Sequence, residues 1–221
     1  MTARLNGRIA GLVYLGVVAT GVFTLAYVPG RIFADADPAA IASAISSNAA
    51  LFDASNYAAL AMSAFFLALP FALSRVLSRY GRNAARLLIV FVAASVPFSL
   101  LAVAQHFELG RAVADGAVAG DMIETRVASY DKWMDVASIF WGLWLAPLGW
   151  LILKSGAVPR LLGALLIFGC FAYLANYFGP ILYRGYADLP FRGWLSMPGS
   201  LGEIGTCLWL LFMGARPAAA Y

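Results

Sequence analysis

The stretch FWGLWLAPLGWLILKSGAVPRLLGALLIFGCFAYL, residues 140–174, contains two apolar runs separated by the short polar turn KSGAVPR, residues 154–160. A helix needs about 20 apolar residues, roughly 30 Å of length, to cross the hydrocarbon core of a bilayer. With their flanks, the two runs reach that length over residues 133–153 and 160–179. The stretch therefore predicts a hairpin of two transmembrane helices, because helices satisfy their backbone groups within one apolar segment.

Four further apolar stretches have the same length, at about residues 9–29, 54–74, 86–106 and 198–214. The composition agrees, because 62% of the 221 residues are hydrophobic and 12% are charged. This leaves too little polar surface to cover a soluble globule. We predict an all-α, polytopic membrane protein, with residues 1–221 forming a single domain of six transmembrane helices in one bundle.

The charged residues are distributed unevenly between the two sets of connections. All 11 acidic residues fall in one set or at its edges. The other set holds the basic residues Arg4, Arg8, Arg75, Arg79, Arg82, Arg86, Lys154, Arg160 and Arg216. Lys and Arg near the spans mark the cytoplasmic side, so we expect a multi-pass protein of the cytoplasmic (inner) membrane with both termini in the cytoplasm. The net charge of +4 then reflects topology, and no nucleic-acid partner is expected.

The acidic connections are long enough to carry structure of their own. Asp37 followed by Pro38 is typical of a helix start, and Ile41 and Ile45 lie four residues apart on one face. This pattern predicts a short helix on the outer surface.

The connection after the third span suggests an early start for the fourth helix. Residues 110–120 have the composition of a loop, and Asp121 with Glu124 resembles a capping box. We therefore expect the fourth helix to begin near Met122, extend over about 32 residues and stand partly outside the membrane.

Polar side chains recur at the outer ends of five predicted helices. Glu203 lies about one turn inside an apolar run. A charge at the middle of a span costs about 2.5–3.5 kcal/mol on insertion scales, and a partner or a proton would lower the cost of Glu203. Asp135 shares one helix face with Ser138 and Gly142. We predict an outward-facing polar pocket that binds a ligand through Asp135, Glu203, His106, Asn176, Tyr173, Tyr177, Asn56 and Gln105.

Several kinds of chemistry are excluded by counting residues. A single histidine excludes a three-histidine zinc hydrolase and a bis-histidine haem. The sequence has no GxSxG, no HExxH, no phosphate loop and no dinucleotide fingerprint. No catalytic residue is assigned, and neither a cofactor nor a metal is expected, although a mixed site of His106, Glu108, Asp135 and Glu203 is an alternative for a divalent ion. Cys170 and Cys207 fall inside spans, which favours buried free thiols.

The residues favour a protein that is not an enzyme and whose pocket binds a small molecule, a lipid headgroup or a partner protein. One alternative is a proton- or cation-coupled transporter. A second is a membrane enzyme that uses Asp135 and Glu203 as acid and base on a lipid-linked substrate. Membrane lipid and a small-molecule ligand are the expected partners. Small residues at helix-packing spacing, such as Gly7 and Gly11, favour close helix contacts, within one chain or between the copies of a homo-oligomer.

Three segments carry a family resemblance over nearly the whole chain. They are RIAGLVYLGVVATGVF at residues 8–23, the stretch at residues 140–174 quoted above, and GEIGTCLWLLFMG at residues 202–214. With these segments the chain resembles the bacterial integral membrane family called domain of unknown function 4386. The resemblance implies six membrane helices and no particular activity. The segment YDKWMDVASIFWG, residues 130–142, lacks the histidine expected before the aspartate in many members, which argues against a metal there.

Overall fold

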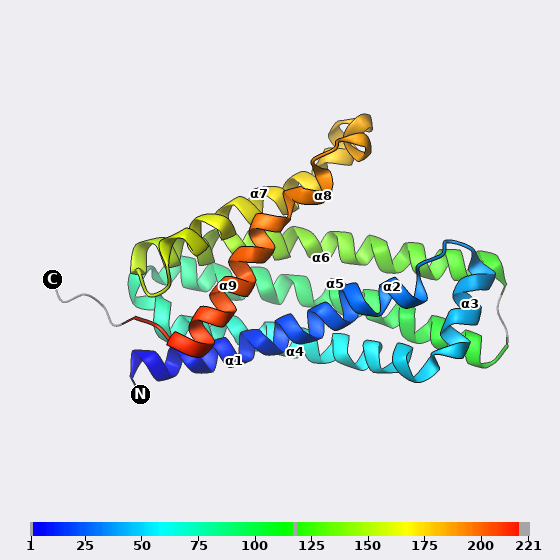
Figure 1. Cartoon of the computed structure of the whole chain (residues 1–221), viewed down its shortest axis with the longest axis horizontal. Helices are drawn as coiled ribbons and strands as arrows, with labels where there is room; N and C mark the ends of the chain where they lie inside the picture. The colour runs from blue at the N-terminus through cyan, green and yellow to red at the C-terminus, as the bar shows by residue number, and fades with distance from the viewer. Residues whose placement is uncertain (1, 117–118, 217–221) are drawn as a thin grey trace.

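The computed structural model describes residues 2–116 and 119–216, and within these ranges all regular secondary structure is helical (Figure 1). The long helices are α1 (Ala3–Val22), α4 (Ala49–Leu77), α5 (Arg82–Ala114), α6 (Gly120–Ser155), α7 (Arg160–Leu182) and α9 (Met197–Met213). The short ones are the π-helix η1 (Phe23–Tyr27), α2 (Pro29–Ile32), α3 (Pro38–Ser47), η2 (Ser78–Tyr80), η3 (Arg184–Asp188) and α8 (Arg192–Leu195). The all-α prediction is confirmed.

Five helical segments are long and apolar enough to cross a membrane, so the chain is a multi-pass membrane protein. They are Ala3–Ile32, Ala49–Tyr80, Arg82–Ala114, Gly120–Ser155 and Arg160–Leu182. Helix α9 has 17 residues, at the lower limit for a crossing. The sixth crossing therefore remains a prediction.

The long helices pack in a ring. Each one contacts its neighbours in the order α1, α4, α5, α6, α7, α9, and α9 closes the ring against α1. Glycines allow the closure: a Cβ on Gly11 of α1 would lie 2.3 Å from the backbone nitrogen of Leu211, and Gly199 of α9 meets Gly169 of α7. The small residues thus make close helix contacts within one chain, as expected from their spacing.

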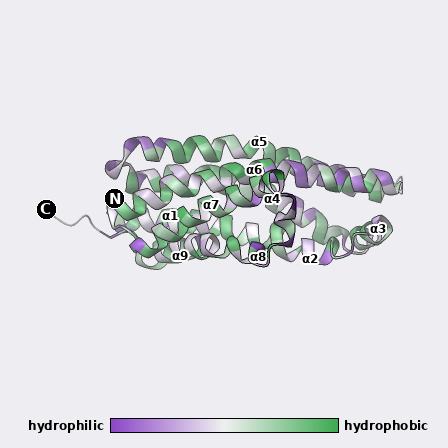
Figure 2. Cartoon of the chain, turned by 90° about the horizontal axis from the view of Figure 1, so that it is seen from above, coloured by the Kyte–Doolittle hydropathy of each residue, from purple (hydrophilic) through white to green (hydrophobic). Residues whose placement is uncertain are grey.

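The start of α1 and the end of α9 lie together at one end of the ring (Figure 1). The Arg8 guanidinium donates a hydrogen bond to the carbonyl oxygen of Phe212 at 3.1 Å. We call this the terminal end, and the opposite end, which carries α3, the distal end. Hydrophilic positions gather toward both ends, and the middle of the bundle is apolar (Figure 2).

Helices α5 and α6 extend together at the distal end. The prediction of a loop from residue 110 was wrong, because α5 continues through Gly110 to Ala114. Leu109 is fully buried there, and Arg126 of α6 forms a salt bridge with Glu108 of α5. Packing against α6 therefore outweighs the weak helix propensity of the glycine.

Helix α6 confirms the prediction of an extended fourth helix. Its 36 residues correspond to about 54 Å. The expected capping role of Asp121 was wrong, because the helix begins at Gly120 with Ala119 as its N-cap. The Asp121 carboxylate instead accepts a hydrogen bond from the backbone nitrogen of Met122 at 2.9 Å.

The short helix predicted after Asp37 is present as α3, and it covers part of the distal end (Figure 1). The Asp37 carboxylate caps it by accepting a hydrogen bond from the backbone nitrogen of Ala40 at 3.0 Å. Ile41 and Ile45 are buried in a second apolar cluster with Phe52 and residues of α2, α5 and α6. The apolar face of α3 thus packs on the protein itself.

Candidate functional site

Six of the eight side chains predicted to form one polar pocket are divided among three cavities. Glu203 and Tyr173 line a cavity of about 280 Å³ inside the ring, which we call the central cavity. His106 lines a cavity of about 440 Å³ beside α2 and α3, the α3 cavity. A third cavity of about 590 Å³ lies between the distal parts of α6 and α7 and the segment before α9, and we call it the loop cavity.

The loop cavity contains the other predicted polar residues of α6 and α7. Asp135 and Tyr177 line it beside Tyr173, which also lines the central cavity. The carboxylates of Asp135 and Glu203 therefore face different spaces.

Asn176 also lines the loop cavity, but both ends of its amide are occupied. Its nitrogen donates to the Ser196 hydroxyl at 2.9 Å, and its oxygen accepts from the Tyr186 hydroxyl at 2.8 Å. These bonds fix the segment between α7 and α9. Asn176 thus has a structural role in this state, and its binding role remains a prediction.

Asn56 and Gln105 line none of the three cavities. Asn56 is 2% exposed, and its amide nitrogen has no hydrogen-bond partner. Gln105 accepts a hydrogen bond from Arg126 at 2.9 Å. Both contribute to the interior of the distal half of the bundle.

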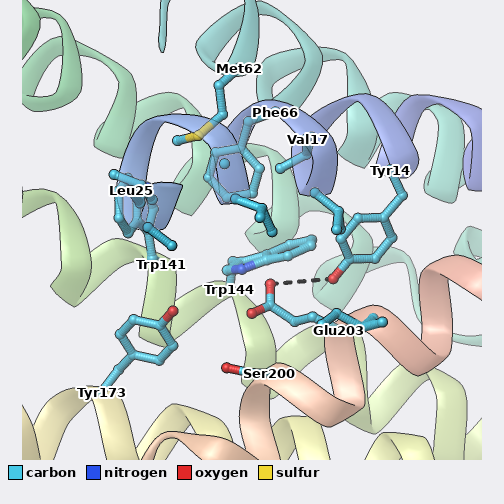
Figure 3. A pocket seen from close by; sticks show the side chains of 15 residues that line it. Tyr14, Val17, Leu25, Met62, Phe66, Trp141, Trp144, Tyr173, Ser200 and Glu203 are labelled. Atoms are coloured by element: carbon cyan, nitrogen blue, oxygen red, sulfur yellow. Dashed lines mark hydrogen bonds between the residues drawn. The ribbon is translucent and has the colours of Figure 1, made fainter. Parts of the chain in front are cut away.

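The central cavity is surrounded by α1, η1, α4, α6, α7 and α9 (Figure 3). Its walls include Tyr14, Val17, Leu25, Met62, Phe66, Trp141, Trp144, Tyr173, Ser200 and Glu203. On α1 and η1 the lining runs from Tyr14 to Ala26, which corresponds to about 18 Å along the helix axis. The cavity is therefore elongated along the axis of α1 and η1.

Polar atoms without partners gather around the central cavity. The Tyr14 hydroxyl donates a hydrogen bond to one oxygen of Glu203 at 3.3 Å. Among the described residues, nothing donates to the other oxygen of Glu203. The indole N–H of Trp141 is buried without a partner. Leaving such a group unpaired costs about 1–3 kcal/mol, and the unpartnered Glu203 oxygen favours a ligand that carries a hydrogen-bond donor.

The cavity opens sideways between α1 and α9. Val22 is 56% exposed, Leu25 42% and Ile204 41%, although all three line the cavity. The two helices touch at the terminal end and diverge toward the distal end (Figure 1). In a multi-pass protein, an apolar mouth on the side of the bundle faces the hydrocarbon of the bilayer.

The π-helix η1 forms part of this mouth. The backbone nitrogen of Val28 donates to the carbonyl oxygen of Phe23 at 3.0 Å, five residues earlier. Leu25 and Ala26 of η1 line the cavity. Single π turns within helices are often found at functional sites.

Metal ligands do not gather in the described part of the chain. Across residues 2–116 and 119–216, no three His, Cys, Asp or Glu side chains lie close enough to hold an ion together. The four residues of the alternative divalent site are accordingly not brought together. Cys170 and Cys207 are buried free thiols, as expected.

Sequence reasoning overlooked Tyr14, Trp141 and Trp144 as lining residues. A signal was present for Tyr14, because it follows Gly7 and Gly11 at helical spacing and so shares their face toward α9. The tryptophans carried no such signal, because both fall in the middle of the predicted span 133–153, where an apolar ring can face either the lipid or a cavity.

Comparisons with known proteins agree with the resemblance. The sequence model of the family described as "Domain of unknown function (DUF4386)" matches residues 9–214. An "Uncharacterized protein" of Archaeoglobus fulgidus is 33% identical over 84 residues, which cover 38% of this chain and 47% of the relative. The match therefore spans about half the length of that relative. No solved structure matches the chain.

Proposed function

The chain belongs to the DUF4386 family, whose description names no activity, and from the geometry we propose that it binds an amphiphilic small molecule in the central cavity. The ligand enters from the bilayer between α1 and α9. Its polar group lies against Glu203, and its hydrocarbon part lies against the apolar wall toward η1. The protein binds this molecule without changing it chemically.

One observation carries this proposal. A mostly apolar cavity contains a carboxylate that retains an unpartnered oxygen beside the Tyr14 hydroxyl. Ligand sites are typically apolar clefts with a few polar groups that fix orientation, and a volume of about 280 Å³ lies close to their lower limit. A hydroxyl or amide group would donate to the unpartnered oxygen of Glu203.

The apolar mouth limits the source of the ligand. Val22, Leu25 and Ile204 present hydrocarbon to the bilayer, and a molecule that enters past them must carry a chain compatible with lipid. A lipid with one chain or a similar amphiphile satisfies this condition. Membrane lipid is therefore the partner that we propose, in line with the expectation from the sequence.

The membrane location that we propose follows from the distribution of basic residues between the connections. We place the protein in a bacterial inner membrane, with the terminal end and both termini on the cytoplasmic side, because the basic connections lie there. The distal end then faces outward. The central cavity lies in the outward half of the bundle, and α9 provides the sixth crossing.

A coupled transporter is the second candidate. It is favoured by η1, because transporters tend to build their sites where a membrane helix is interrupted. Flux of a bound amphiphile across liposomes that responds to a pH gradient would support transport over simple binding. The enzyme alternative lacks this support, since Asp135 and Glu203 line different cavities.

The test is the binding of 1-monododecanoylglycerol, whose hydroxyl groups both donate and accept hydrogen bonds. Native mass spectrometry of the protein released from nanodiscs would count the bound molecules. We expect one saturable molecule on the wild type and about tenfold weaker binding to Glu203→Leu, which corresponds to about 1.4 kcal/mol. Asp135→Leu is the matched control and should bind like the wild type. If 1-monododecanoylglycerol binds equally well to Glu203→Leu and to the wild type, the proposed site is wrong.

A further inference from the structure

A second cavity at the distal end has a chemistry different from that of the central cavity. The α3 cavity lies beside α2, α3 and α6, and its volume is about 440 Å³. It shares no lining residue with the central cavity.

His106 is the polar group inside this cavity. Its side chain is 9% exposed, and no described residue forms a hydrogen bond or salt bridge with its ring. It is held by aromatic contacts instead. The Tyr130 ring stacks on it with centroids 3.7 Å apart and planes 3° apart, and the Phe33 ring lies 5.2 Å away.

The absence of a partner for His106 is unusual for a buried group. Most buried polar side chains find a partner, and each exception needs an explanation. The His106 ring lines the cavity, so a ligand bound there lies beside an imidazole that has no partner among the described residues. A ligand with an N–H donor would satisfy a neutral imidazole nitrogen.

The rim of the α3 cavity is acidic. Asp35, Glu124 and Asp131 line it, and no Lys or Arg is among the described residues that do so. The neighbouring basic side chains are engaged elsewhere: Arg31 lies over the Tyr27 ring, and Arg126 pairs with Glu108. The electrostatic potential in the α3 cavity is therefore negative, which favours a bound cation.

We propose that the α3 cavity is a binding site for a small organic cation with N–H donors, a protonated amine. The ammonium group donates to His106 and is neutralised by the carboxylates of the rim. Its organic part lies against apolar side chains of the cavity wall, such as Ile41 and Val127. This inference is independent of the function proposed for the central cavity.

Phenethylamine is the probe, and 2-phenylethanol is its neutral counterpart of nearly the same shape. Isothermal titration of the full chain in nanodiscs should show saturable binding of the amine and at least about tenfold weaker binding of the alcohol. His106→Phe keeps a ring for stacking but removes the acceptor, and it should weaken binding of the amine by about tenfold. Asp131→Asn should weaken it about fivefold.

Asp188→Asn is the matched control, because this carboxylate lies on η3 and does not line the α3 cavity. Its affinity for phenethylamine should equal that of the wild type. The proposal is overturned if the amine and the alcohol bind equally, if His106→Phe binds like the wild type, or if the wild type shows no saturable binding at millimolar concentrations. Circular dichroism of each variant distinguishes a lost site from a lost fold.

Discussion

Replacing Gly21 by leucine should stabilise the protein and close its central cavity. Gly21 lines the cavity, and a Cβ at this position would have Met62 Sδ as its nearest neighbour at 3.4 Å, an ordinary contact. A glycine within a helix costs about 0.5–1 kcal/mol relative to alanine, so Gly21→Leu should raise the free energy of unfolding by about that amount. The leucine side chain then extends into a cavity of about 280 Å³.

Binding should change in the opposite direction. With part of the cavity filled, 1-monododecanoylglycerol should bind at least about tenfold more weakly, a loss of about 1.4 kcal/mol. Stability is measured by SDS titration and binding by native mass spectrometry. Gly30→Leu is the control, because a Cβ on Gly30 meets nothing within 4 Å and Gly30 does not line the cavity. Undiminished binding to Gly21→Leu, or a loss of stability beyond about 1 kcal/mol, would refute the reasoning.

Three further substitutions test the packing on which the cavities depend. Gly11→Ala should lower the free energy of unfolding in SDS titrations by about 1–3 kcal/mol, because its Cβ would lie 2.3 Å from the backbone nitrogen of Leu211; unchanged stability would contradict the close contact of α1 with α9. Asp37→Ala removes the cap of α3 and should cost about 1 kcal/mol, visible as faster hydrogen exchange confined to residues 38–47. Asn176→Leu removes the hydrogen bonds to Ser196 and Tyr186, at about 1 kcal/mol each, so residues 183–196 should become sensitive to protease while the long helices persist.

The positions of the helices could be predicted from the sequence because local chemistry determines them. Apolar length sets a membrane span, and the carboxylate of Asp37 followed by Pro38 sets the start of α3. The close helix contacts at Gly11 and Gly199 were also predictable from their spacing. None of these features depends on knowing the neighbour in advance.

The distal extension of α5 was not predictable in the same way. Gly110 resembled the start of a loop. The helix continues because Leu109 is buried and α6 packs alongside this part of α5. Local propensity is weak, and tertiary packing often overrides it. That packing involves α6 residues such as Arg126, which no local window contains.

The sequence also could not show that the predicted polar pocket is divided into several cavities. Periodicity shows which residues share a face of one helix, and span boundaries indicate their depth. The rotation of each helix about its own axis depends on packing against its neighbours. Asp135 and Glu203 were therefore predicted at a similar depth, whereas the structure places them in different cavities, with Tyr173 lining both.

Reversible closure of the mouth between α1 and α9 tests the central claim most directly. Val22 of α1 and Ile204 of α9 line the cavity and are exposed, so Val22→Cys with Ile204→Cys can be joined by a reducible bifunctional thiosulfonate, while the native cysteines are buried. Binding of 1-monododecanoylglycerol is measured before cross-linking, after it and after reduction. The proposed route predicts that binding is lost on cross-linking and returns on reduction. Binding that is unchanged in the cross-linked protein would contradict entry between α1 and α9.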